Sequence, residues 1–171
     1  MKILFVGDVV GVNGVNLLRK SLPQLKKEYN CDVCIVNGEN SNESGTGMNS
    51  RDAQDIFGCG ADVITGGNHS MRMANMQLYT ENEFILCPAN LLYSEDGCGV
   101  SVVDMGRQQL RVINLMGVAF IDNHRNPFFE LDKILKDISC KNIIVDFHAE
   151  STAEKYAFAN YADGRVSAVI G

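Results

Sequence analysis

Four short apolar runs, each followed at once by polar residues, constrain the fold of this chain more than any other feature. The runs predict strands at about 2–7, 33–37, 62–66 and 143–147, and the residues after them include Asp8, Glu39-Asn40, Asn68-His69 and His148. Runs that are apolar on both faces are typical of strands inside a parallel sheet. Ligands of open α/β sheets bind beyond the carboxyl ends of such strands. Because Asp, Glu, Asn and His suit a hard or borderline divalent cation, the pattern predicts a metal site at this edge.

The segments between the first three runs have helical signals, which predict an α/β fold. Apolar residues recur every three or four positions over 13–29, although Pro23 should kink or split this helix. A second helix is expected at about 51–58, capped by Asn49 or Ser50. The methionine-rich segment after His69 predicts a further short helix.

The organisation of the chain changes in its second half. After a short strand expected at 84–87, residues 100–105 and 109–115 alternate like a hairpin around Gly106-Arg107, which indicates a second sheet. Helices are expected at 128–138 and from a capping box at Ser151 and Glu154 to about residue 162. A last strand, 166–170, ends at Gly171. We interpret residues 1–171 as a single domain and as the N-terminal portion of a longer one.

Composition narrows the classes of function. The 15 basic against 21 acidic residues, a net charge of −6, argue against binding of duplex nucleic acid. No apolar run approaches the ~20 residues that span a bilayer, and the N-terminus lacks a signal-peptide pattern. The six cysteines include one C-x-x-C pair, Cys31 and Cys34, without the partners of a zinc site. Reduced, mostly buried thiols in a cytoplasmic protein are therefore expected.

The first two strand ends offer carboxylates, each with an ordinary structural alternative. Gly7, Gly11 and Gly14 do not have the G-x-G-x-x-G spacing of a dinucleotide loop, and Asp8 would repel a pyrophosphate there. Asp8 is better explained as a metal ligand, with a turn cap as the alternative. Glu39 could bridge two cations and Asn40 could bind a phosphate oxygen, although Gly-Glu-Asn can also be a simple turn.

The other two strand ends offer histidines. Asn68 could bind a hard cation through its amide oxygen, and His69 could be a ligand or a general acid. A structural hydrogen bond is the alternative for His69 and for His148. Three acidic residues near His148 could orient it or could be solvated caps: Asp146, Glu150 and Glu154. His124, away from any strand end, is interpreted as an ordinary surface residue.

Taken together, these motifs resemble one family. The chain is similar over essentially its whole length to the bacterial calcineurin-like metallophosphoesterases of the YmdB type, which are 2′,3′-cyclic nucleotide phosphodiesterases. The matching runs, in family order, are 5–11, 36–40, 62–69, 88–90, 112–117, 145–150 and 163–169.

The resemblance implies a four-layer α/β/β/α sandwich, here incomplete at the C-terminus, with a dinuclear centre of iron, manganese or zinc. It implies Asp8 on one metal, Glu39 bridging both, and Asn68 and His148 on the other. His69 would be the general acid, and Asn40 would help to hold solvent or phosphate. The implied partner is a small phosphodiester or cyclic nucleotide, and the family tends to self-associate, so a homo-oligomer is expected.

The chain departs from the family pattern in two places. The family continues beyond the strand at Gly171 with a Thr-His-Thr-His motif that carries further metal ligands, and this sequence stops before it. After Asn68-His69 the family has an aromatic residue and an acid, where this chain has Ser70, Met71 and Arg72. A metal-dependent phosphodiesterase is the favoured function. The alternative is a non-catalytic metal- or nucleotide-binding regulatory protein that keeps the fold.

Overall fold

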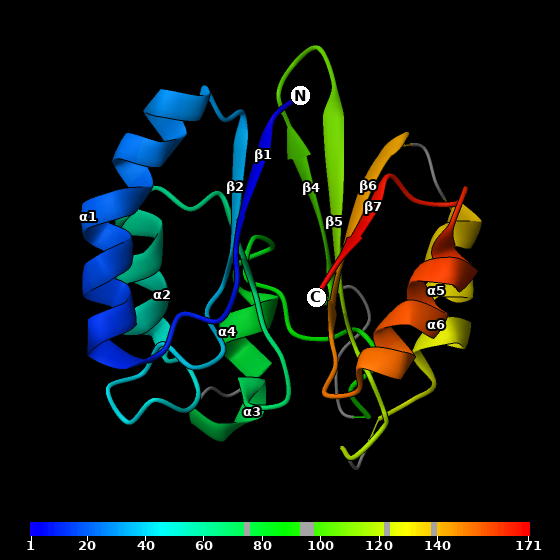
Figure 1. The fold of residues 1–171 in the computed structure, drawn as a ribbon. Helices are drawn as coiled ribbons and strands as arrows, with labels where there is room; N and C mark the ends of the chain where they lie inside the picture. The colour runs from blue at the N-terminus through cyan, green and yellow to red at the C-terminus, as the bar shows by residue number, and fades with distance from the viewer. Residues whose placement is uncertain (74–75, 93–97, 122–123, 138–139) are drawn as a thin grey trace. The chain divides into compact units, whose positions relative to one another are not determined.

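A computed structural model describes residues 1–171 apart from 74–75, 93–97, 122–123 and 138–139. The chain forms two compact units, Met1–Ile85 and Leu86–Gly171, which are described separately below (Figure 1).

The first unit contains a parallel three-stranded sheet in the order β1-β2-β3. Its strands are β1 (Ile3–Val6), β2 (Val33–Asn37) and β3 (Val63–Thr65). Helices α1 (Gly11–Tyr29) and α2 (Ser50–Gly58) lie side by side against one face of this sheet, as Figure 1 shows. Two short helices, α3 (Ser70–Met73) and α4 (Met76–Thr80), follow β3 and confirm the helical prediction for the methionine-rich segment. All residues of β2 are buried because this strand is central in the sheet.

Helix α1 is continuous through Pro23, so the expected split of this helix was wrong. Proline removes one main-chain hydrogen bond and crowds the preceding turn. Burial of the predicted apolar stripe offsets that cost, since Val15, Leu18 and Leu22 are all buried. The helix ends at Asn30, which has a φ of 50° and donates its N–H to the carbonyls of the last turn.

The cap of α2 is as predicted, but residues 84–87 form no strand, only an isolated bridge. Asn49 accepts hydrogen bonds from the backbone N–H groups of the first turn, and Asp52 accepts one from Asn49 N at 2.9 Å, so a complete capping box is present. Within 84–87 only Ile85 forms a bridge, to Ile64 of β3. The polar Glu-Asn-Glu sequence before it and Pro88 after it leave too few residues for a ladder.

The second unit contains the mixed sheet that the hairpin pattern predicted. Its strands, in the order β4-β5-β6-β7, are β4 (Val100–Asp104), β5 (Gln109–Met116), β6 (Asn142–His148) and β7 (Ala168–Ile170). β4 pairs antiparallel with β5, and the other neighbours are parallel. Helices α5 (Pro127–Ile134) and α6 (Thr152–Ala162) cover one face of this sheet (Figure 1), and a 3₁₀ turn, η1 (Leu135–Asp137), follows α5. The helix expected over 128–138 is therefore shorter, and Ile138 lies outside the described residues.

An aromatic cluster holds α5 and α6 on this sheet. The rings of Phe147 and Phe158 stack with centroids 4.0 Å apart and planes at 9°, and both side chains are fully buried. Phe128 of α5 packs against Phe158 at 5.5 Å. This contact anchors β6, whose last residue is His148, to both helices.

The capping box expected at the start of α6 is only half formed. Ser151 caps the helix by accepting a hydrogen bond from Glu154 N. The carboxylate of Glu154 instead accepts from Val118 N at 2.8 Å and Ala119 N at 3.1 Å. Those two N–H groups belong to the loop after β5, which sequence patterning could not place beside α6. The carboxylate of Glu154 therefore holds the backbone of the loop after β5, and we call this contact the clamp. Glu154 is neither a solvated cap of α6 nor a partner of His148.

Candidate functional site

The ends of β2 and β3 in the first unit are joined by the side chain of Asn37. Its Nδ2 donates to Gly66 O at 3.1 Å, and its Oδ1 accepts from Glu39 N at 3.1 Å. Gly38 N also donates to Thr65 O at 3.0 Å. These bonds fix the turn after β2 against the turn after β3. The sequence analysis gave Asn37 no role, because its position at the last residue of an apolar strand carries no distinctive signal.

Gly38 brings this turn down onto the core. A Cβ at this position would lie 2.9 Å from the side chains of both Ile56 and Ile64, so only glycine fits the observed backbone. The close packing directs the next side chain, that of Glu39, along the strand edge. Its carboxylate is almost completely buried, with the residue 2% exposed.

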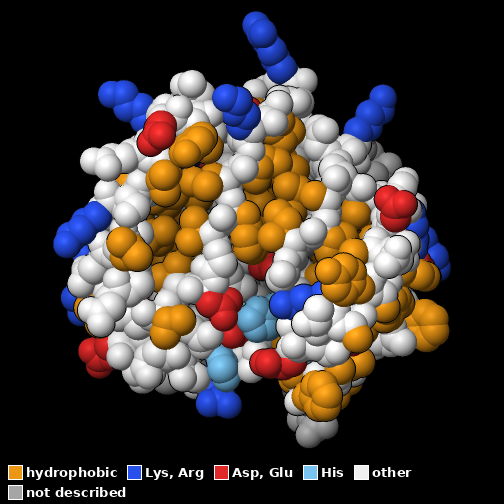
Figure 2. Space-filling view, viewed as in Figure 1, with side chains coloured by type: hydrophobic (Ala, Val, Ile, Leu, Met, Phe, Trp, Pro, Cys, Tyr) orange, Lys and Arg blue, Asp and Glu red, His pale blue; other side chains and the backbone are white. Residues whose placement is uncertain are grey.

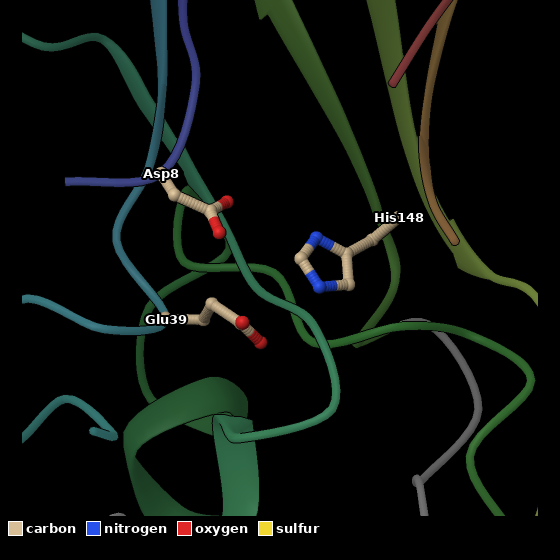
Figure 3. A group of neighbouring side chains, drawn as sticks. All are labelled: Asp8, Glu39 and His148. Atoms are coloured by element: carbon tan, nitrogen blue, oxygen red, sulfur yellow. The ribbon is translucent and has the colours of Figure 1, made fainter. Parts of the chain in front are cut away.

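Asp8 and Glu39 form a carboxylate pair at the ends of β1 and β2. One ligand oxygen of each lies within 4.8 Å of the other, and Figure 3 shows both carboxylates extending from their strand ends toward the same side. Asp8 is exposed and Glu39 is buried. The parallel register of the two strands explains their proximity, because it carries both carboxyl ends to one edge of the sheet.

Asn40, Asn68 and His69 form a hydrogen-bonded network around Glu39. Asn40 Nδ2 and His69 N each donate to the Glu39 carboxylate at 3.0 Å. His69 Nδ1 lies 2.8 Å from Asn40 Oδ1, and Asn68 Nδ2 lies 3.1 Å from His69 Nε2. The donors and acceptors agree when His69 is neutral, carries its proton on Nδ1 and accepts from Asn68 at Nε2. The orientation of the imidazole is therefore fixed from both sides.

The turn that carries Asn68 and His69 is anchored by Ser70, which sequence analysis noted only as a departure from the family pattern. Gly67 N donates to Ser70 Oγ at 2.8 Å, and the hydroxyl of Tyr79 donates to Ser70 O at 2.7 Å. Both Ser70 and Tyr79 are buried. A serine at the start of a short helix was the available signal, because it suggests a capping role.

The donor set of the first unit fits divalent cations. It consists of two carboxylates, those of Asp8 and Glu39, and the amide oxygen of Asn68, whose Nδ2 is turned toward His69. Such oxygens suit hard and borderline cations, which bind them at ~2.0–2.2 Å. The two carboxylates are close enough to share an ion after a small movement, and burial of Glu39 would strengthen its attraction to a cation.

In the second unit, the sequence-predicted histidine His148 is the last residue of β6 and is half-buried; Figure 3 labels it as well. Of its acidic neighbours in sequence, Asp146 is buried and Glu150 is exposed. The end of β5 lies beside it, since Gly117 N donates to His148 O at 2.9 Å.

Asn90, quoted above only as part of a motif, organises the backbone beside this strand end. Its Nδ2 donates to Met116 O at 2.7 Å and to Arg125 O at 2.9 Å, and its Oδ1 accepts from Met116 N at 2.9 Å. Asn90 is completely buried. Near it, His124 forms an isolated backbone bridge with Leu91. A polar residue directly after Pro88-Ala89 gave no signal of this role, because all its partners are distant in sequence.

A family model described as "YmdB-like protein" matches residues 4–171. The chain belongs to the YmdB-like family. The 2′,3′-cyclic-nucleotide 2′-phosphodiesterase of Bacillus subtilis is 36% identical to it over 174 residues, covering 100% of this chain and 66% of the relative. The chain thus spans slightly less than two thirds of the length of that curated YmdB-like relative.

Two solved structures have the same fold. A hypothetical protein from Thermus thermophilus superposes with a TM-score of 0.87 at 33% identity, covering 99% of this chain and 66% of that one. A novel phosphatase from Mycoplasma pneumoniae superposes with a TM-score of 0.86 at 33% identity, covering 97% and 61%. These likenesses confirm the predicted α/β fold class. The family match and the Bacillus subtilis relative confirm the resemblance to the YmdB type.

On the face shown in Figure 2, Lys and Arg side chains are scattered singly among acidic and neutral ones and form no continuous basic patch. Among the described parts of this YmdB-like chain, no helix combines the length and apolar character needed to cross a bilayer.

Proposed function

We propose that this YmdB-like chain is part of a metal-dependent phosphodiesterase that hydrolyses 2′,3′-cyclic nucleotides or related phosphodiesters. The observation that carries the proposal is the strand-end cluster of the first unit, where a buried carboxylate, a second carboxylate and an oriented histidine meet through two asparagines. The similarity to the 2′,3′-cyclic-nucleotide 2′-phosphodiesterase of Bacillus subtilis supports the choice of substrate class.

The proposed metal ligands are Asp8, Glu39, Asn68 and His148, holding two divalent ions, with Glu39 shared between them. Two ions of iron, manganese or zinc would polarise the phosphoryl group and activate water for attack. The buried position of Glu39 supports its assignment as the shared ligand, since it is the carboxylate with both oxygens already directed by donors.

His69 is proposed as the general acid and Asn40 as a substrate-binding residue. The side chain of His69 is 24% exposed, so a substrate can reach it, and Asn40 holds its Nδ1 at 2.8 Å. To act as the acid, the ring would carry a second proton, on Nε2, while Nδ1–H stays on Asn40. The leaving oxygen of the substrate would replace the Asn68 amide as the partner of Nε2 and would take that proton, which leaves the imidazole neutral. Asn40 orients the ring during this transfer and can also donate to a phosphate oxygen.

The test is hydrolysis of bis-p-nitrophenyl phosphate and 2′,3′-cyclic AMP with added Mn²⁺. The assay uses this 171-residue chain and any longer natural chain that contains it. His69→Ala should reduce kcat by at least ~100-fold, the usual range for removing an acid–base group. Glu39→Gln should also reduce kcat, through loss of a proposed metal ligand. Asp104→Asn is the matched control, because Asp104 is an exposed carboxylate at the end of β4 whose hydrogen bonds within the described residues are to Gly106 N and Gln109.

The outcomes separate enzyme from binding protein. Hydrolysis that requires Mn²⁺ and is lost in Glu39→Gln and His69→Ala, but kept in Asp104→Asn, supports the proposal. Absence of hydrolysis in every form refutes it. If Mn²⁺ then still binds in calorimetry and binds less in Glu39→Gln, the non-catalytic binding protein is the correct function.

Two further features belong to the proposal. The six cysteines, all among the described residues, form no disulfide, and five of them are buried, which supports a cytoplasmic protein kept in a reducing compartment. Self-association to a homo-oligomer stays a prediction, to be measured by analytical ultracentrifugation.

A further inference from the structure

Phe120, in the loop that follows β5, is the most exposed large apolar side chain among the described residues. It is 92% exposed, and its φ is 67°, in the left-handed region that residues other than glycine seldom adopt. A bulky side chain there is held by its surroundings and does not follow its own preference. Phe120 therefore combines an unfavourable backbone conformation with an unfavourable exposure of an aromatic ring.

The backbone before Phe120 is held by Glu154 of α6. Both carboxylate oxygens of Glu154 accept loop N–H groups, from Val118 at 2.8 Å and from Ala119 at 3.1 Å. Gly117 packs so closely on the carboxylate of Glu154 that no Cβ fits there. Bonds from a carboxylate to backbone N–H groups are among the stronger hydrogen bonds. The backbone that leads to Phe120 is thus held in place by these contacts.

The same loop begins beside a proposed metal ligand, His148 at the end of β6. Gly117 N donates to His148 O at 2.9 Å, and Asn90 holds the preceding residue, Met116, by two hydrogen bonds. Phe120 is three residues after Gly117 in the chain, a stretch that spans at most about 10 Å. This is the length scale of one mononucleotide, so a phosphate bound at His148 would have its base within reach of Phe120.

We propose that Phe120 is a specificity-determining residue whose ring stacks on the nucleobase of the substrate. The inference rests on the proposed function and extends it, by assigning recognition of the base to this loop. Aromatic rings bind unpaired bases through stacking, which every base permits. Phe120 should therefore favour nucleoside cyclic phosphates over diesters without a base, with little preference among bases.

A protein-docking surface is the less favoured explanation for the exposed ring. Such surfaces are contiguous apolar patches, whereas in the described part of this loop only Val118, at 41% exposure, accompanies Phe120 as an exposed large apolar residue. A single ring on a clamped backbone matches the size of a base.

The experiment compares two substrates in the presence of Mn²⁺: 2′,3′-cyclic AMP and glycerol 1,2-cyclic phosphate, which has no base. Phe120→Ala should raise KM for the nucleotide about tenfold, equivalent to about 1.4 kcal/mol, with kcat and the base-free substrate unchanged. Phe120→Trp should restore the nucleotide KM. Phe129→Ala is the matched control, because Phe129 is 73% exposed on α5 of the same unit and should change neither substrate.

Glu154→Gln tests the clamp, since the amide keeps one acceptor oxygen for two loop N–H groups. It should raise the nucleotide KM in the same direction as Phe120→Ala without altering the base-free KM. Equal KM changes for both substrates in Phe120→Ala, or no change in either, would overturn the inference while the wild-type activity left the proposed function intact.

A binding measurement separates the two proposals if no hydrolysis is seen. The chain is titrated with adenosine 3′-monophosphate and followed by calorimetry, for the wild type, Phe120→Ala and Phe129→Ala. About tenfold weaker binding in Phe120→Ala alone supports base stacking even where the phosphodiesterase proposal has failed. Identical affinities, or no binding by the wild type, refute the assignment of Phe120.

Discussion

Replacement of Asn90 by alanine should be among the most destabilising polar substitutions in the second unit. Its side chain makes three hydrogen bonds, at 2.7, 2.9 and 2.9 Å, to the backbone of Met116 and Arg125. Each such bond contributes about 1 kcal/mol net, and a buried group left without a partner costs about 1–3 kcal/mol. Both Asn90 and Met116 are fully buried, so water cannot replace the lost amide. We expect Asn90→Ala to lower the free energy of unfolding by about 3 kcal/mol.

The assay is urea denaturation of the whole chain, combined with hydrogen exchange at the Met116 amide. Asn160→Ala is the control, because Asn160 is exposed on α6 and makes one side-chain bond, to Tyr156 O at 2.8 Å. It should change stability by less than about 0.5 kcal/mol. Exchange of the Met116 amide should accelerate in Asn90→Ala and stay slow in Asn160→Ala. Equal stability of the two variants, or unchanged Met116 exchange in Asn90→Ala, would refute the reasoning.

Asn90→Asp tests how the loss of stability relative to the wild type changes with pH. The carboxylate would keep the acceptor for Met116 N but face two carbonyl oxygens in a buried site, which raises its folded-state pKa above the unfolded value of about 3.9. A raised acid pKa means that stability is lost as pH rises through the interval between the two values. The deficit of Asn90→Asp relative to wild type should therefore widen between pH 4 and pH 7. A deficit that narrows over this range contradicts the buried geometry.

Three further expectations test the packing. In urea titrations, Gly38→Ala should lower the free energy of unfolding by about 1–3 kcal/mol, because its Cβ would overlap two isoleucine side chains. Gly58→Ala is the control and should be neutral or stabilising, since no heavy atom lies within 4 Å of a Cβ built there. The reverse order of stability would contradict the packing. Burial raises the pKa of the Cys34 and Cys87 thiols to about 12, so both should resist Ellman's reagent at pH 8 until urea unfolds the chain, and rapid reaction in the native state would show the burial to be wrong. Phe158→Ala should lower the free energy of unfolding by about 3–5 kcal/mol through loss of its stacked aromatic neighbour, and a change below about 1 kcal/mol would disprove that role.

Local signals predicted most of the regular structure. The cap at Asn49 and the turn at Gly106 depend on side chains within a few residues of the backbone they serve, so their sequence patterns were sufficient. The apolar runs likewise identified β2 and β6, because a strand buried on both faces has little freedom to be anything else. At Pro23 the local preference for a break did not prevail: α1 runs through it, with Val15, Leu18 and Leu22 buried in the turns before the proline.

In the candidate site, too, some features follow from the sequence and others only from the tertiary structure. Sequence alone determined which residues stand at the strand ends, including Asp8, Glu39 and His69, since the chemistry of the side chains and the ends of the apolar runs are both legible there. Only the tertiary structure decided how they are held: Asn37 joins two strand ends, Asn40 orients His69, and Glu154 leaves its own helix cap to clamp a distant loop. These contacts are hydrogen bonds between segments up to 36 residues apart in the chain. No periodicity or spacing in the sequence indicates which distant residues will become partners.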